Sequence, residues 1–77
     1  MAAKLTFRYD RVGDILYIDK VQPYAEQRSR QLDDEVVARY NPETGDIETL
    51  EVLFFSKRLF DDEFLELPID AQLRPAV

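Results

Sequence analysis

Carboxylates are the reactive side chains that this chain supplies in quantity. Asp10 and Asp14 flank one turn, and a second acidic turn consists of Asp33, Asp34 and Glu35. Carboxylate oxygens suit Mg²⁺ or Ca²⁺, so one interpretation is a metal-dependent activity that uses these two turns. Aspartates at turn ends also hydrogen-bond the nearby backbone without any ligand, and nothing here resembles the twelve-residue calcium loop. Turn chemistry is the favoured interpretation, and metal binding is kept as the alternative.

The usual constellations for nucleophilic catalysis are absent from the sequence. It contains no His and no Cys, and its two serines, Ser29 and Ser56, therefore lack a partner base. The two glycines, Gly13 and Gly45, do not form a phosphate-binding loop. We therefore expect a protein that is not an enzyme, with no catalytic, cofactor-binding or metal-ligating residue and no cofactor.

The charge balance limits the partners that the chain can bind. Ten basic and 16 acidic residues give a net charge of −6, which repels a phosphate backbone, so we expect no direct nucleic-acid binding. An acidic surface suits a basic protein partner, although solubility alone explains the charge as well. No apolar run approaches the roughly 20 residues that cross a bilayer, and residues 1–4 do not begin a signal segment. We expect no membrane contact and a cytoplasmic location.

The length of 77 residues predicts a single domain over residues 1–77 with a narrow stability margin. Small domains usually gain support from disulfides, a structural metal or a partner subunit. The lack of Cys and His removes disulfides and disfavours a zinc site. Oligomerisation remains, so we predict a homodimer.

The elements that must position these residues follow from the hydrophobic pattern. It predicts a mainly β (β-rich α+β) fold, an antiparallel meander of about five strands with a short C-terminal helix and an extended arm. Residues 4–9, 15–19, 35–40 and 47–54 are predicted to form antiparallel strands of one sheet. The core is expected to contain Phe7, Tyr9, Leu16, Ile18, Val37, Leu50 and Val52.

Turn and edge signals complete this fold prediction. Residues 10–14 should close a hairpin between the first two strands, and Pro42 with Gly45 should close another, with Gly45 in the left-handed conformation. Residues 25–32 are almost wholly polar. We interpret them as an edge strand, because charged side chains protect an exposed edge from unwanted pairing.

The C-terminal third is rich in apolar side chains that a thin sheet cannot hide. Ser56 is expected to cap a helix over residues 57–64, and alternation over residues 65–70 indicates an extended segment. Adjacent phenylalanines in a strand point to opposite faces, so one ring needs cover from elsewhere. The predicted dimer interface therefore contains Phe54, Phe55, Phe60, Phe64, Leu65, Leu67 and Ile69. The alternative is that this segment folds back on its own sheet and gives a monomer.

Several short motifs occur in a recognisable order. They are Phe7-Arg8-Tyr9-Asp10, Asp14-Ile15-Leu16-Tyr17-Ile18, and the segments 36–41 and 45–53. In this order the chain resembles the bacterial domain of unknown function 2283 family over roughly residues 4–55. The resemblance implies a compact β-rich domain of no established activity, sometimes suspected of sitting beside small toxin-like proteins, and it supplies no catalytic residue.

Three functional hypotheses follow. The leading one is a small, non-enzymatic, self-associating protein-interaction module, and an antitoxin-like binder of a basic protein is the specific form considered first. The second is a carboxylate-based metal-binding protein or metal-dependent enzyme. The third is small-molecule binding between subunits, which needs an apolar cavity of about 300 Å³ or more.

Overall fold

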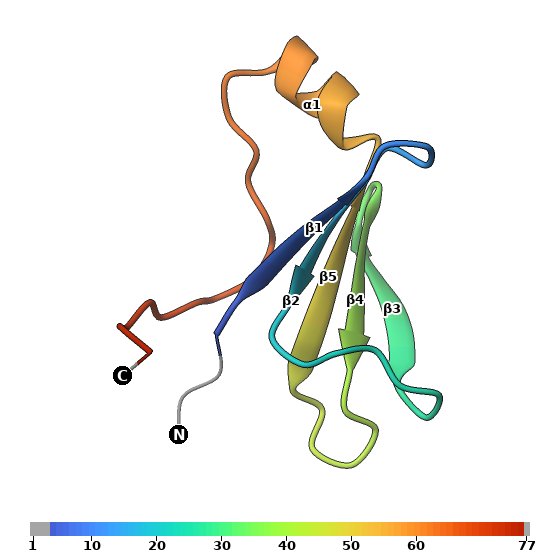
Figure 1. The fold of residues 1–77 in the computed structure, drawn as a ribbon, viewed down its shortest axis with the longest axis vertical. Coiled ribbons are helices and arrows are strands. Elements are labelled where there is room, and N and C mark those ends of the chain that lie inside the picture. Colours follow the sequence, from blue (N-terminus) through green and yellow to red (C-terminus); the bar gives the residue numbers. More distant parts are fainter. Residues whose placement is uncertain (1–3, 77) are drawn as a thin grey trace.

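The computed structural model describes residues 4–76 as one antiparallel sheet with a short helix and a C-terminal arm (Figure 1). The strands are β1 (Thr6–Asp10), β2 (Ile15–Asp19), β3 (Arg28–Asp33), β4 (Val36–Tyr40) and β5 (Ile47–Leu53). Helix α1 (Phe55–Asp61) follows β5, and residues 62–76 form the arm. This arrangement confirms the expected β-rich α+β fold. The expectation about a signal segment falls largely on residues 1–3, which lie, like Val77, outside the described residues.

The strand order is β1-β2-β5-β4-β3, so the expected meander is interrupted between β2 and β3. The hairpins β1–β2, β3–β4 and β4–β5 are all present. Apolar β5 takes the centre of the sheet, and polar β3 lies at an edge, as predicted for that segment. Residues 20–27 span the end of the sheet, and Thr49 Oγ1 donates a hydrogen bond of 3.1 Å to the carbonyl oxygen of Val21. The local hydrophobic pattern does not predict that residues 20–27 connect two strands that are not neighbours in the sheet.

The hydrophobic core occupies one face of the three central strands. Val52 stands between Leu16 and Val36 in one cross-strand row, and Leu50 stands between Ile18 and Ala38 in the next. The buried hydrophobic residues are Val36, Ala38, Leu50 and Val52. The burial of Leu50 and Val52 confirms two of the expected core residues, while Leu16 and Ile18 are only half-buried.

Three of the expected core residues are placed differently. Val37 lies opposite Glu51, so its side chain is on the face opposite the core. Successive residues of a strand point to opposite faces, and in β4 the residues that face the core are Val36 and Ala38. Phe7 and Tyr9 are 63% and 45% exposed. Both belong to β1, which has a neighbouring strand on one side only. The prediction that they are buried is therefore wrong.

The opposite face of the sheet is covered by paired charges. Arg8 forms an ion pair with the buried carboxylate of Asp19, and its guanidinium lies 4.4 Å from the centre of the Tyr17 ring. Arg39 pairs with Glu51 at 3.1 Å across β4 and β5. Cross-strand pairs of this kind stabilise a sheet face without a second layer.

The hairpin loop between β4 and β5 has the expected geometry. Gly45 has a φ of 79°, which confirms the left-handed conformation. Asn41 Oδ1 accepts hydrogen bonds from the backbone N–H groups of Glu43 and Thr44 at 2.8 and 3.2 Å. The Asn-Pro-Glu-Thr-Gly sequence therefore closes the loop through its own polar groups.

The C-terminal region departs from the sequence expectations at its start. Strand β5 ends at Leu53, and Phe54 has a left-handed φ of 53°, so Phe54 and Phe55 do not continue the strand. Helix α1 begins two residues before the predicted start and ends at Asp61. Ser56 lies inside its first turn and does not cap it. Ser56 is not needed as a cap, because the first N–H groups of the helix donate hydrogen bonds to a residue of another turn.

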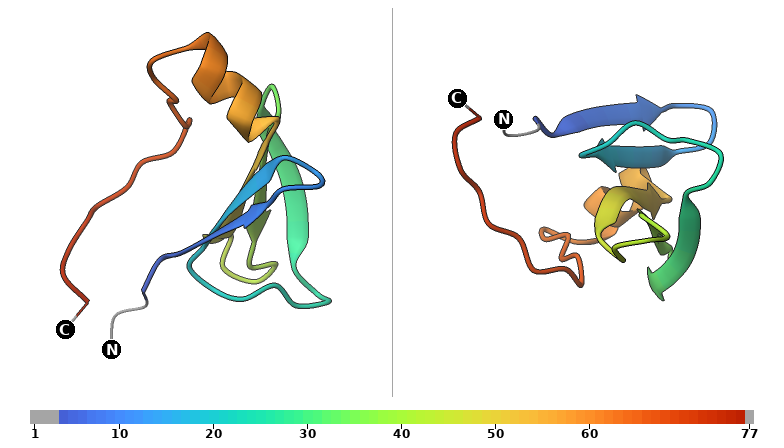
Figure 2. Two further views of the ribbon diagram at one scale, coloured as in Figure 1. Left: turned by 45° about the horizontal axis from the view of Figure 1, so that its top comes forward. Right: turned by 90° about the horizontal axis from the view of Figure 1, so that it is seen from below.

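The arm runs as the predicted extended segment. Leu65, Leu67 and Ile69 are half-buried and alternate with exposed residues. Ile69 and neighbouring arm residues line a groove of about 320 Å³ together with Leu5, Ile18 and Leu50 of the sheet. The arm therefore passes beside the core face of its own sheet (Figure 2). No helix among residues 4–76 is long and apolar enough to cross a membrane.

Candidate interaction surface

Helix α1 is anchored by Asp14, a residue of the β1–β2 turn that lies 42 positions from Ser56. The Asp14 carboxylate accepts hydrogen bonds from the backbone N–H of Ser56 at 3.0 Å and from its hydroxyl at 2.8 Å. The backbone oxygen of Asp14 accepts a further bond from the N–H of Phe55 at 3.0 Å. Phe54 provides no side-chain cap. Asp14 thus accepts the hydrogen bonds that an N-cap residue normally accepts, although it belongs to a turn that is distant in sequence.

Tyr9 completes this anchor from strand β1. Its hydroxyl donates a hydrogen bond to Asp14 Oδ1, and its ring packs edge-on against Phe55 with a centroid separation of 5.9 Å. The hydrogen bonds from Tyr9 and from the Ser56 backbone lower the pKa of Asp14, and the carboxylate in turn raises the pKa of Tyr9. Asp14 is therefore an ionised structural acceptor at neutral pH.

The second acidic turn holds the helix through Arg58. Arg58 Nη2 donates a hydrogen bond of 3.3 Å to the backbone oxygen of Asp34, and its Nε lies 3.9 Å from the Glu35 carboxylate. Asp33 accepts a hydrogen bond from the backbone N–H of Asp34 within the turn. Among residues 4–76, no three acidic side chains come together as a metal site. The acidic residues singled out in the sequence are instead used in turns and helix attachment.

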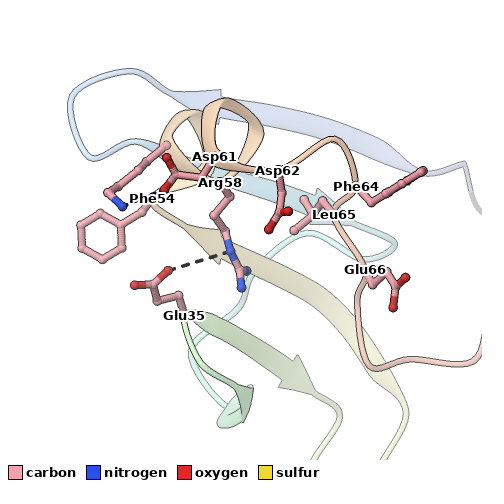
Figure 3. A pocket seen from close by; sticks show the side chains of 9 residues that line it. Glu35, Phe54, Arg58, Asp61, Asp62, Phe64, Leu65 and Glu66 are labelled. Atoms are coloured by element: carbon pink, nitrogen blue, oxygen red, sulfur yellow. Dashed lines mark hydrogen bonds and ion pairs between the residues drawn. The ribbon is translucent and has the colours of Figure 1, made fainter.

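The helix, the β3–β4 turn and the start of the arm surround a groove of about 680 Å³ (Figure 3). Phe54 and Phe64 stand at opposite ends of the groove, with Glu35 and Arg58 between them. The groove is lined by Glu35, Phe54, Lys57, Arg58, Asp61, Asp62, Phe64, Leu65 and Glu66. Six of these nine side chains are charged. Small-molecule pockets of this size are lined mainly by apolar side chains, so this charged lining is unlike one.

The predicted interface residues divide into two groups. Phe60, Phe64 and Phe54 are 90%, 77% and 50% exposed. The other four are half-buried within their own chain, namely Phe55, Leu65, Leu67 and Ile69. The folding of the arm onto its own sheet was the alternative considered from the sequence. Three of the four phenylalanines of the predicted interface, Phe54, Phe60 and Phe64, nevertheless remain accessible.

Acidic side chains surround these exposed rings. We define the α1–arm surface as Phe54, Phe60 and Phe64 together with Asp61, Asp62, Glu63 and Glu66, all of which are exposed. Lys57 neutralises part of this charge through an ion pair of 2.9 Å with Asp61. The surface is therefore both aromatic and acidic.

Most of the chain matches a model of a known protein family. The model described as Protein of unknown function (DUF2283) matches residues 6–56. The chain belongs to this family. The DUF2283 match covers the sheet and both turns that anchor α1, and it ends in the first turn of the helix. No curated protein and no solved structure matches the chain.

The sequence did not reveal which carboxylates form structural anchors. Besides Asp14, Glu48 on β5 accepts hydrogen bonds from the Tyr24 hydroxyl at 2.6 Å and from Gln27 Nε2 at 3.2 Å. The hydrogen bond to Glu48 raises the pKa of Tyr24 to about 12, and it lowers the pKa of Glu48. These bonds hold residues 20–27 against the sheet. Their partners are 21 and 24 positions away from Glu48, so no local motif marks them.

Proposed function

We propose that this DUF2283 domain is a non-enzymatic protein-interaction module that contacts another protein through the α1–arm surface. The observation that carries the proposal is the exposure of Phe60 and Phe64 in a chain that buries Val36 and Val52 almost completely. Aromatic side chains are enriched among the residues that dominate binding energy at protein interfaces. Their exposure beside a charged groove supports a binding role.

A basic protein is the partner class that the α1–arm surface favours. Arg or Lys side chains of a partner can stack on the exposed rings of Phe60 and Phe64 and pair with the surrounding carboxylates. An antitoxin-like binder of a small basic protein is the specific form of this proposal. Self-association through residues 54–69 is the other form. The acidic residues oppose it, because a two-fold axis would bring like charges together.

Capture from the source cells tests the proposal. We expect the wild-type domain to retain a basic protein that the double variant Phe60→Ser/Phe64→Ser does not retain. Val12→Ser is the matched control, because Val12 is also an apolar residue with a fully exposed side chain but lies on the β1–β2 turn. Retention of the same proteins by all three chains would reject the α1–arm surface as the contact.

Charge neutralisation tests the partner class separately. Replacing Asp61, Asp62 and Glu63 with their amides is expected to weaken capture and its dependence on salt concentration. The control replaces Glu26, Glu43 and Asp46, three exposed acids away from α1, with their amides. Equal weakening by both sets would mean that net charge alone drives binding. Heat released on titration with Mg²⁺, Ca²⁺ or Mn²⁺ would instead support the metal-dependent alternative.

A further inference from the structure

The two edges of the sheet are protected to different degrees. Edge strand β3 carries Arg28 and Arg30 and has a register shift between Gln31 and Asp33. Charged side chains and bulges of this kind prevent an edge from pairing with another chain. Edge strand β1 pairs with β2 without any register shift, and all five of its residues are exposed. In the right-hand view of Figure 2, no described part of the chain lies beyond β1.

The side chains of β1 also do not prevent this edge from pairing with another strand. Phe7 and Tyr9 project from the core face of the sheet, and Leu5, just before the strand, is 49% exposed. Arg8 projects from the other face, but its guanidinium is held by Asp19 and lies over Tyr17. The one basic side chain in the strand is thus directed at its own sheet. An added strand would cover the exposed apolar groups.

We propose that β1 pairs antiparallel with β1 of a second copy of this chain, in the register centred on Phe7. The two sheets then become one continuous sheet with both core faces on the same side. In this register each residue finds a compatible neighbour. The pairs are Phe7 with Phe7, Thr6 with Arg8, Leu5 with Tyr9, and Lys4 with Asp10.

Neighbouring registers are less favourable. A two-fold axis perpendicular to the sheet pairs residues of the same face, so the neighbouring registers are centred on Thr6, Arg8 or Tyr9. The register centred on Thr6 places Lys4 opposite Arg8, two like charges. The register centred on Arg8 places this residue opposite its own copy, and directly opposed like charges destabilise a strand pair. The register centred on Tyr9 places Phe7 opposite Arg11 and ends in the turn residue Gly13. The edge is therefore self-complementary around Phe7.

This inference goes beyond the proposed function, because it places self-association on β1 and not on the α1–arm surface. Strand β1 and the α1–arm surface belong to separate elements, so a dimer formed through β1 leaves Phe60 and Phe64 available to another protein. The two surfaces can be tested independently for this reason.

Site-directed cross-linking gives a direct test, because the chain contains no native cysteine. In the proposed register only the residue on the two-fold axis meets its own copy. We expect Phe7→Cys to give a covalent dimer with a short bifunctional maleimide. Leu5→Cys and Tyr9→Cys are expected to cross-link poorly alone and well when the two variants are mixed. Val12→Cys, which is exposed but lies outside β1, is the control and should not give a covalent dimer.

The alternative outcomes separate this inference from the proposed function. Cross-linking through Phe60→Cys without cross-linking through Phe7→Cys overturns the β1 contact and supports self-association at the α1–arm surface. No cross-linking at either position, with a mass of 9.1 kDa by light scattering, overturns self-association altogether. Binding of a basic protein through the α1–arm surface is then still decided by the capture experiment.

A charge exchange tests the register. Lys4→Glu is expected to raise the dimer dissociation constant about tenfold, because it places a glutamate opposite Asp10 in both symmetry-related pairs. The double variant Lys4→Glu/Asp10→Lys reverses both pairs and should restore dimerisation. Circular dichroism of each variant establishes that the sheet is retained. An unchanged dissociation constant for Lys4→Glu in a retained fold overturns the proposed register.

Discussion

The core face of the sheet and the α1–arm surface differ in how far their apolar side chains are exposed to solvent. The core face buries small aliphatic residues such as Val36 and Val52, whereas the α1–arm surface leaves the larger rings of Phe60 and Phe64 in water. Aromatic rings would contribute more by burial than valine does. The buried hydrophobic residues lie in the sheet, so we expect the stability of the domain to depend on the core face much more than on the α1–arm surface. We expect the exposed rings of Phe60 and Phe64 to contribute little to the free energy of unfolding.

The attachment between these regions is mainly polar. Helix α1 has no buried residue, and its contacts with the sheet include the hydrogen bonds of Asp14 and Arg58 and the packing of Phe55 against Tyr9. Segments with few buried apolar groups open at lower free energy than the core does. The helix should therefore respond to perturbations that leave the sheet intact.

The largest expected effect is on the core face. Val52→Ala removes two methyl groups from a site with 0% exposure, so the free energy of unfolding should fall by about 2–3 kcal/mol. Urea denaturation measures this loss. Val12→Ala, at a residue that is 99% exposed, is the matched control and should change stability by less than about 0.5 kcal/mol. Equal losses for the two variants would remove the basis of the comparison.

The hairpin that joins two core strands gives the next largest effect. Gly45→Val is expected to lower stability by about 1–2 kcal/mol, because a β-branched residue tolerates a φ of 79° poorly. A Cβ atom at this position meets no atom within 4 Å, so we attribute the loss to backbone strain. Gly45→Asn, which tolerates this conformation better, should lose less. An unchanged melting temperature for Gly45→Val would show that the loop relaxes in solution.

Local patterns predicted much of the sheet. Alternation marked four strands, the Asn41 to Gly45 sequence marked the hairpin, and the polar segment marked the edge strand β3. The pairing of β2 with β5 could not be predicted in this way, because it joins residues at least 30 positions apart. The burial of Phe7 and Tyr9 was misjudged for the same reason. Alternation shows which face a residue occupies, but strand order decides whether that face is covered.

The candidate surface was predicted in part. The richness of residues 54–69 in apolar side chains pointed to Phe54, Phe60 and Phe64, which are exposed in the structure. The helix start was missed, because its N-terminal acceptor is Asp14, a residue distant in sequence. Ser56 is the donor in that contact and not the cap. The sequence shows directly which segments are rich in apolar residues. It does not show which turns distant in sequence contact one another.

A smaller effect is expected at the helix anchor, and it depends on pH. Hydrogen bonds lower the folded-state pKa of Asp14, so the anchor contributes stability that is complete above the unfolded-state pKa and is lost as pH falls through the folded-state pKa. Acidification should therefore release α1 before the sheet unfolds. The backbone amide resonance of Ser56 in NMR spectra reports this step.

Asp14→Asn tests whether this carboxylate causes the acid-induced step. The amide retains an acceptor oxygen but cannot ionise, so the step in the Ser56 resonance should disappear and the helix should be attached more weakly at neutral pH. Asp46→Asn, at an exposed acid in the β4–β5 loop, is the control and should leave the step unchanged. Persistence of the step in Asp14→Asn would assign it to another group.

The smallest expected effect on stability is at the α1–arm surface. In Phe60→Asp/Phe64→Asp both replaced rings are largely exposed, so the free energy of unfolding should change by less than about 0.5 kcal/mol. A loss comparable to that of Val52→Ala would show that these rings are covered in solution. Light scattering of the same variant decides which surface dimerises. A mass that stays at twice 9.1 kDa agrees with pairing through β1, whereas a fall to 9.1 kDa with the fold retained places the dimer contact on the α1–arm surface.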